Sequence, residues 1–185
     1  MLLRRFVGAI DALNIWMGRL SAFLVIALVV ICSTNAVMRY VFSIGYVWMQ
    51  EAYVAAFGVS FMLMAGYAYL TDQHVRVDIY HARYSPKTRA WVEILGILVF
   101  LWPWLYVVAR YSQGFILDAW RLREGSSQAG GMPGIFLVKT GIWAFCALVA
   151  LQSLATMARA ITVITGRPDL LPVRETVEGA TKMAN

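Results

Sequence analysis

The fold is decided by the stretch LSAFLVIALVVICSTNAVM at residues 20–38, which contains no charged side chain. An α-helix needs about 20 mostly apolar residues to cross the hydrocarbon core of a bilayer. Similar runs follow at 52–71, at 90–109, where Glu93 is the one charge, and at 140–158. We therefore predict four transmembrane helices, at about 20–39, 48–70, 90–109 and 135–158.

The composition excludes an ordinary soluble domain. Of the 185 residues, 61% are hydrophobic and 14% are charged, and the mean hydropathy is +0.66. A soluble protein of this length cannot bury so much apolar surface, because small domains keep a large surface-to-volume ratio. The predicted fold class is an all-α, multi-pass membrane protein with a four-helix transmembrane domain over residues 20–160.

The basic residues predict the orientation of the chain in the membrane. In a soluble protein a net charge of +6 would suggest a nucleic-acid partner, but here the basic residues flank the apolar runs. If the amino terminus is cytoplasmic, 11 of the 16 Lys and Arg residues lie inside; the 5 outside are Arg39, Arg110, Arg121, Arg123 and Lys139. The positive-inside rule therefore predicts that both termini are cytoplasmic, and we expect no nucleic-acid partner.

The first predicted span is preceded by an amphipathic pattern at residues 1–19. Apolar residues recur at spacings of three and four, at Leu3, Phe6, Ile10, Leu13 and Met17. This predicts an N-terminal amphipathic helix that either lies in the cytoplasmic interface or continues the first span inward. At the other end, residues 161–185 are predicted to form a cytoplasmic tail.

Local signals mark the ends of the predicted spans. A tight hairpin turn is expected at 42–45. Ser85 is a predicted N-cap with Pro86 at the first helical position, and Pro103 should kink the third span. The run Gly130-Gly131-Met132-Pro133-Gly134 cannot continue a helix and predicts a turn into the fourth span.

Spans two and four carry small or polar side chains, for which contact with lipid gives no gain in free energy. These residues are Ala52, Ala56, Ser60, Gln152 and Ser153. Helix interfaces in membranes are rich in such residues, so we expect another protein to cover some of them.

Three charged residues lie within or near the spans: Glu51, Glu93 and Lys139. None is at the centre of a span, so we expect their side chains to snorkel to the headgroups.

Glu51 also has a predicted partner. Arg39 and Glu51 are each six residues from Gly45, so a symmetric hairpin would bring them to the same depth. Asn35 shares the helix face of Arg39. The spacing predicts a hydrogen-bonded Asn–Arg–Glu cluster near the outer surface.

Nothing in the sequence predicts an active site. His74 and His81, the only histidines, lie seven residues apart in one loop, whereas axial haem ligands must project from facing helices. There is no Gly-rich phosphate loop and no nucleophile near the histidines. We therefore expect no enzymatic activity, no cofactor and no metal site in this chain.

Several of these residues belong to stretches that occur together in one known family. The stretches are NAVMRYVF at 35–42, Trp48-Met-Gln-Glu51, His74-Val-Arg76-Val-Asp78, and Gly130-Gly131-Met-Pro133 with Lys139 after it. In this order, on a four-span chain, they resemble the small membrane subunit of tripartite ATP-independent periplasmic (TRAP) transporters, the DctQ-like family. One departure is that the family often has a second carboxylate beside Glu51, where this chain has Gln50 and Ala52.

The resemblance implies a role in the bacterial inner (cytoplasmic) membrane. In this family a large multispan subunit carries the substrate and sodium sites and moves as an elevator. A periplasmic substrate-binding protein delivers the substrate, usually a small organic acid. The resemblance implies that this chain is a scaffold for the large subunit, with that subunit, the binding protein and membrane lipids as partners, and that sodium binds only to the large subunit.

Two alternatives from other classes remain at this stage. The chain could anchor a redox complex that holds haem or quinone, which a haem spectrum of the purified protein would support. It could also form a small homo-oligomeric channel or carrier, which transport by this chain alone in liposomes would support.

Overall fold

The computed structural model describes residues 2–72, 85–167 and 170–171. These residues form helices and no strand; the elements are α1 (Leu2–Val41), α2 (Val47–Leu70), α4 (Pro86–Gly96), the π-helical turn η1 (Ile97–Leu101), α5 (Trp102–Arg121) and α6 (Ile135–Ile164). Four segments are long and apolar enough to cross a membrane: α1, α2, the continuous segment Pro86–Arg121, and α6. The predicted all-α fold with four membrane-spanning helices is confirmed.

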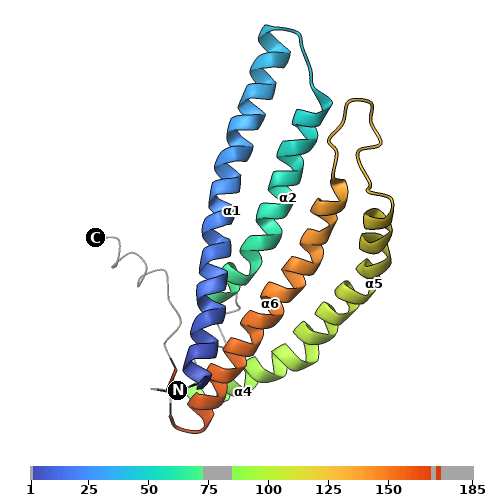
Figure 1. Cartoon of the computed structure of the whole chain (residues 1–185). Coiled ribbons are helices and arrows are strands. Elements are labelled where there is room, and N and C mark those ends of the chain that lie inside the picture. Colours follow the sequence, from blue (N-terminus) through green and yellow to red (C-terminus); the bar gives the residue numbers. More distant parts are fainter. Residues whose placement is uncertain (1, 73–84, 168–169, 172–185) are drawn as a thin grey trace, which may run out of the picture.

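The helices lie side by side in the order α1, α2, α6, α5 (Figure 1). Each packs on its neighbour in this row, and α4 and the start of α1 also contact α6. The beginning of α1 and the end of α6 lie at one end of the molecule, called here the terminal end (Figure 1). The connections 42–46 and 122–134 lie at the opposite end, called the loop end. The arrangement is a row with two broad faces.

Helix α1 continues without interruption from Leu2, so the N-terminal segment extends the first span as one helix. Its buried residues are Val7, Ile10, Asn14, Gly18 and Ser21. Of the apolar residues in the expected N-terminal stripe, only Ile10 is buried against this chain, and Leu3, Phe6 and Leu13 are exposed. Small and polar residues make up most of the contact face of α1, because close approach, more than hydrophobicity, selects the contact face of a membrane helix.

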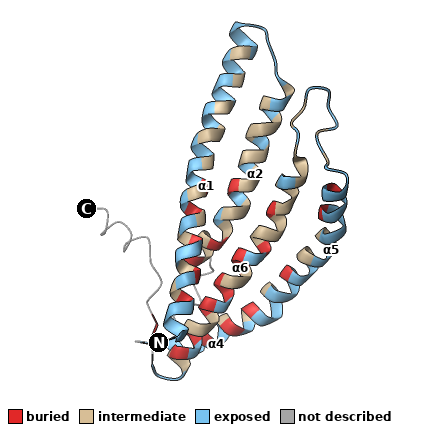
Figure 2. Cartoon of the chain, in the orientation of Figure 1, coloured by how far each residue is buried: buried red, intermediate tan, exposed pale blue. Residues whose placement is uncertain are grey.

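Two glycines allow this close approach. A Cβ added at Gly18 would lie 2.6 Å from Cγ of Tyr67, and one added at Gly66 would lie 1.9 Å from Oδ1 of Asn14. Ser60 is buried on the same helix as Gly66. Figure 2 shows that burial is concentrated toward the terminal end, where α1, α2, α4 and α6 converge.

The third membrane segment begins and bends as its sequence indicates. The hydroxyl of Ser85 accepts a hydrogen bond from the Thr88 N–H at 3.2 Å, and Pro86 occupies the first helical turn. Pro103 has no N–H to donate, and the π-helical turn lies directly before it, with the Trp102 N–H bonded to the Ile97 carbonyl. The predicted distortion at Pro103 is present, and the segment visibly curves between α4 and α5 (Figure 1).

The connections at the loop end depend on left-handed backbone conformations. In the first hairpin that residue is Ser43, with φ of 56°, and Gly45 does not have positive φ. In the 122–134 connection, Gly130 and Gly134 have φ of 73° and 86°, which suits glycine because it has no Cβ. The predicted turn into the fourth span is therefore present at these glycines.

Two of the small or polar residues considered for contact with another protein are covered by this chain instead. Gln152 and Ser153 are fully buried by this chain itself. Ser153 accepts a hydrogen bond at 3.0 Å from Nε1 of Trp102, a residue of the curved third segment. Polar side chains in lipid are satisfied by neighbouring helices, and here those helices belong to the same chain.

The close contact at Gly66 generates a test of the helix row. Gly66→Ala should lower the free energy of unfolding by about 1–3 kcal/mol, because the new methyl group displaces the hydrogen-bonded Asn14 side chain. Gly58→Ala is the matched control on the same helix, since a Cβ there meets nothing within 4 Å. Equilibrium unfolding in detergent measures both; equal stability of the two variants would contradict the contact.

Candidate functional site

Charged and polar groups gather at two depths along α6. Lys139 and Arg159 are 20 residues apart on this helix, which at 1.5 Å per residue is about 30 Å, the thickness of the hydrocarbon core. Each group therefore lies near one membrane surface. We call them the loop-end cluster (Glu51, Glu124, Ser126, Met132 and Lys139) and the terminal-end cluster (Asp11, Asn14, Gln152 and Arg159).

In the loop-end cluster the Glu51 carboxylate holds the 122–134 connection against α2. One carboxylate oxygen accepts a hydrogen bond from the Ser126 hydroxyl, and the other accepts the Met132 N–H at 2.6 Å. The Ser126 N–H also donates to the Met132 carbonyl at 3.0 Å. The Glu51 side chain of α2 thus binds two residues of a loop, Ser126 and Met132, that is far from it in sequence.

The glycine-rich motif allows the loop to pass over this carboxylate. A Cβ added at Gly131 would lie 2.3 Å from Oγ of Ser126 and 2.8 Å from Oε2 of Glu51. Gly130 supplies the left-handed turn before it, and the exposed Pro133 follows. The structure therefore joins Glu51, Gly130, Gly131 and Pro133 in one arrangement, although the sequence indicated them separately.

Lys139 anchors the start of α6 to the same loop. Its Nζ lies 2.5 Å from Oε2 of Glu124 and 3.8 Å from the centre of the Phe115 ring. Nearby, Nε1 of Trp120 donates to the Thr140 hydroxyl at 2.8 Å. These contacts connect α5, the loop and α6, so Lys139 does not simply extend into the headgroups.

The predicted Asn–Arg–Glu cluster is wrong. Arg39 is exposed in the last turn of α1, and no ion pair within the described part of the chain joins it to Glu51. Asn35 is half-buried, and its Oδ1 has no hydrogen-bond partner there. The assumed symmetry about Gly45 fails because the turn is made at Ser43, and Glu51 points to the 122–134 connection instead.

The remaining predicted residues lie elsewhere. Trp48 is exposed near the start of α2, with its ring centre 6.4 Å from that of Tyr46, as expected for interfacial aromatics. His74, Arg76 and Asp78 lie outside the described residues.

The terminal-end cluster ties the start of α1 to the end of α6. Nδ2 of Asn14 donates to Oε1 of Gln152 at 2.7 Å, and Nε2 of Gln152 donates to Oδ1 of Asp11 at 3.3 Å. Arg159 forms an ion pair with Asp11, and their side chains are only 12% and 16% exposed. Removing one member of so buried a pair leaves the other charge without compensation, which is costly.

The sequence interpretation missed this cluster because it followed the apolar stripe at residues 1–19, and Asp11 and Asn14 do not belong to that stripe. A usable signal was present: Asp11, Asn14, Gly18 and Ser21 follow at spacings of three, four and three. Small and polar residues on one helical face are typical of contacts between membrane helices.

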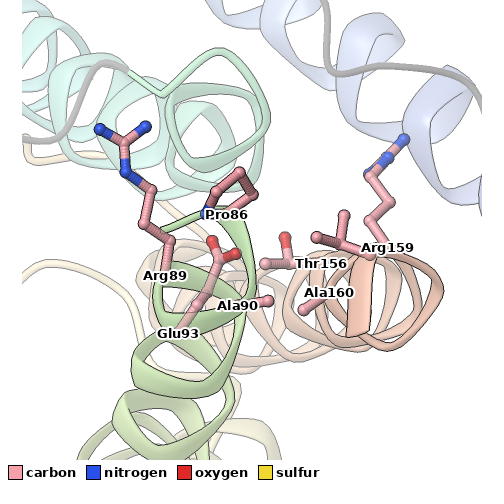
Figure 3. A pocket seen from close by; sticks show the side chains of 8 residues that line it. Pro86, Arg89, Ala90, Glu93, Thr156, Arg159 and Ala160 are labelled. Carbon is pink, nitrogen blue, oxygen red and sulfur yellow. The ribbon is translucent and has the colours of Figure 1, made fainter. Parts of the chain in front are cut away.

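A pocket of about 270 Å³ opens beside the terminal-end cluster, between α4 and α6. Figure 3 shows Arg89 and Arg159 at its two sides, with Glu93 and Thr156 between them. Glu93 therefore faces a pocket shared with α6 rather than extending along the lipid surface. Among the residues that the structure describes, no group of three His, Cys, Asp or Glu side chains could hold a metal ion.

The new partner of Glu51 can be tested by a double-mutant cycle. Because Ser126 donates to Glu51, the variants Glu51→Gln and Ser126→Ala should not be additive: the double variant should be about as stable as the worse single variant. Glu51→Gln combined with Arg39→Gln is the matched control and should be additive. Thermal unfolding of all variants in detergent measures both cycles. Non-additive effects of the Glu51 and Arg39 variants, with additive effects of the Glu51 and Ser126 variants, would instead support the ion pair between Glu51 and Arg39.

Comparison with protein-family models matches residues 28–163 to the model described as Tripartite ATP-independent periplasmic transporters, DctQ component. The match covers about three quarters of the chain and includes the whole loop-end cluster, together with Gln152 and Arg159 of the other. No curated protein and no solved structure matches the chain. The matched family is one of transporter components and not of enzymes. The chain therefore belongs to the DctQ family, the small membrane component of TRAP transporters.

Proposed function

We propose that this chain is the stationary scaffold of a TRAP transporter in the bacterial inner membrane. It holds a large multispan subunit that carries the substrate and sodium sites and moves as an elevator, driving uptake of a small organic acid by the ion gradient. The family match supports the transporter role, and the substrate class rests on the family resemblance.

The main support for the scaffold role is that hydrogen bonds and ion pairs join the helices of the row near both membrane surfaces. The terminal-end cluster joins α1 to α6, and the loop-end cluster joins α2, the 122–134 connection and α6. Helices that are joined near both membrane surfaces resist bending. A subunit that moves as an elevator needs a neighbour that does not bend with it. The described helices also expose large apolar side chains, among them Phe57, Phe61, Phe100 and Tyr106.

The proposed orientation places the loop end in the periplasm. There the 122–134 connection is exposed over much of its length, and Ser126 and Met132 in it donate hydrogen bonds to Glu51. A loop positioned by a rigid framework suits recognition of a soluble partner. We therefore propose that the periplasmic binding protein contacts this connection.

Reporter fusions test the orientation. A fusion after Asn185 should report cytoplasm, and a fusion at Ser127, which is exposed in the loop, should report periplasm, because more basic residues flank the terminal end. A periplasmic signal from the carboxyl terminus would overturn the orientation.

Uptake in cells lacking this subunit tests the scaffold role. Deletion should abolish ion-driven uptake, and the wild-type chain or Gly58→Ala should restore it. Gly66→Leu, which forces a larger side chain against Asn14, should restore it less, in step with the amount of folded subunit. The large subunit must be quantified in each membrane; normal uptake by that subunit alone would refute the scaffold role.

A further inference from the structure

A groove of about 410 Å³ lies between α2 and α6 near the loop end. We call it the α2–α6 groove. Its polar lining residues, Gln50, Glu51 and Gln128, all lie toward the loop end, beside the apolar Val47 and Ile135, whereas the part further from the loop end is lined by Val54, Ala55, Gly58 and Val138 and is apolar. An occupant should therefore have a polar end at the surface and an apolar part directed toward the middle of the bilayer.

The dimensions of the groove favour a hydrocarbon chain. From Val47 to Gly58 the helix rises about 16 Å, so the volume corresponds to a cross-section of roughly 25 Å², or about 6 Å across. A helix with its side chains is about 10–12 Å wide and cannot enter such a groove. An extended acyl chain is narrower and fits.

The charge at the mouth favours a cation. Among the described residues, the Glu51 carboxylate accepts hydrogen bonds from two neutral donors, the Ser126 hydroxyl and the Met132 N–H. The nearest candidate on α6, Lys139, is paired with Glu124, and no Lys or Arg lines the groove. Within the described part of the chain, the Glu51 carboxylate thus has hydrogen-bond donors but no cationic partner.

The mouth also favours a cation that can donate hydrogen bonds. A carboxylate offers about four lone-pair sites, of which two are used here, and the Gln50 and Gln128 side chains add carbonyl acceptors. A primary ammonium has three N–H donors, whereas a quaternary ammonium has none. Ethanolamine satisfies this arrangement better than choline does.

We propose that the α2–α6 groove binds one phospholipid with a primary ammonium headgroup, its acyl chain along Val54 and Gly58 and its ammonium at Glu51. The lipid would fill the space between the outer halves of α2 and α6. The proposal requires only that these two helices cross the membrane, so it stands or falls independently of the scaffold role.

Native mass spectrometry of the full-length chain in mild detergent tests the headgroup. The chain is incubated with equal amounts of phosphatidylethanolamine, phosphatidylcholine and phosphatidylglycerol of the same acyl composition. We expect retention of one phosphatidylethanolamine with roughly tenfold preference, the factor expected from a charge-assisted hydrogen bond. Equal retention of the three lipids would overturn the proposal.

A pair of glycine variants tests the location. Gly58→Trp fills the groove, and Gly114→Trp is the matched control on exposed α5; a Cβ at either position meets nothing within 4 Å. Retention should fall about tenfold in Gly58→Trp and stay unchanged in Gly114→Trp. Thermal unfolding checks that both are folded, and Gly58→Leu replaces Gly58→Trp if the larger side chain prevents folding.

Two outcomes of the variant experiment would contradict the proposal. Equal losses in the Gly58 and Gly114 variants would mean that the lipid binds elsewhere. Normal lipid retention by the Gly58 variant, with loss of a co-purifying membrane subunit, would mean that the groove receives a side chain of that subunit.

Discussion

Helix α6 is the element on which the other helices depend. Between helices in lipid there is little hydrophobic driving force, so close packing and hydrogen bonds decide which helices associate. α6 supplies such partners to α1, to α5 and to the 122–134 connection: Lys139 to Glu124, Thr140 to Trp120, Ser153 to Trp102, Gln152 to Asn14 and Arg159 to Asp11. Because the first and last of these are about one bilayer thickness apart, the helix is fixed at both membrane surfaces.

The two polar clusters fix different parts of the chain. At the terminal end, a cluster of polar residues joins α1 to α6, which are not adjacent in the row; these residues are Asp11, Asn14, Gln152 and Arg159. At the loop end, Glu51 holds a long connection that has no regular structure of its own. A connection of that length is usually mobile or functional, and a single carboxylate on α2 holds it in place.

Some local features could be predicted because their causes are local. Ser85 caps a helix whose first residue is Pro86, Pro103 disturbs the helix around it, and glycines make the turn before α6, since each effect depends on a few consecutive residues. The pairing of Arg39 with Glu51 failed although the two are close in sequence. It assumed a symmetric turn, and the left-handed residue at Ser43 instead leaves Glu51 facing residues about 75 positions away.

The sequence by itself determined that four segments enter the membrane, because the free energy of transferring each segment into lipid is a property of that segment alone. It also determined the family, through short motifs in a constant order. Only the tertiary structure decided which side of each helix is buried. Most sides of these helices are apolar and lipid accepts them equally, so the contact face is selected by close approach at Gly18 and Gly66 and by the partner of Asn14, which is 138 residues away.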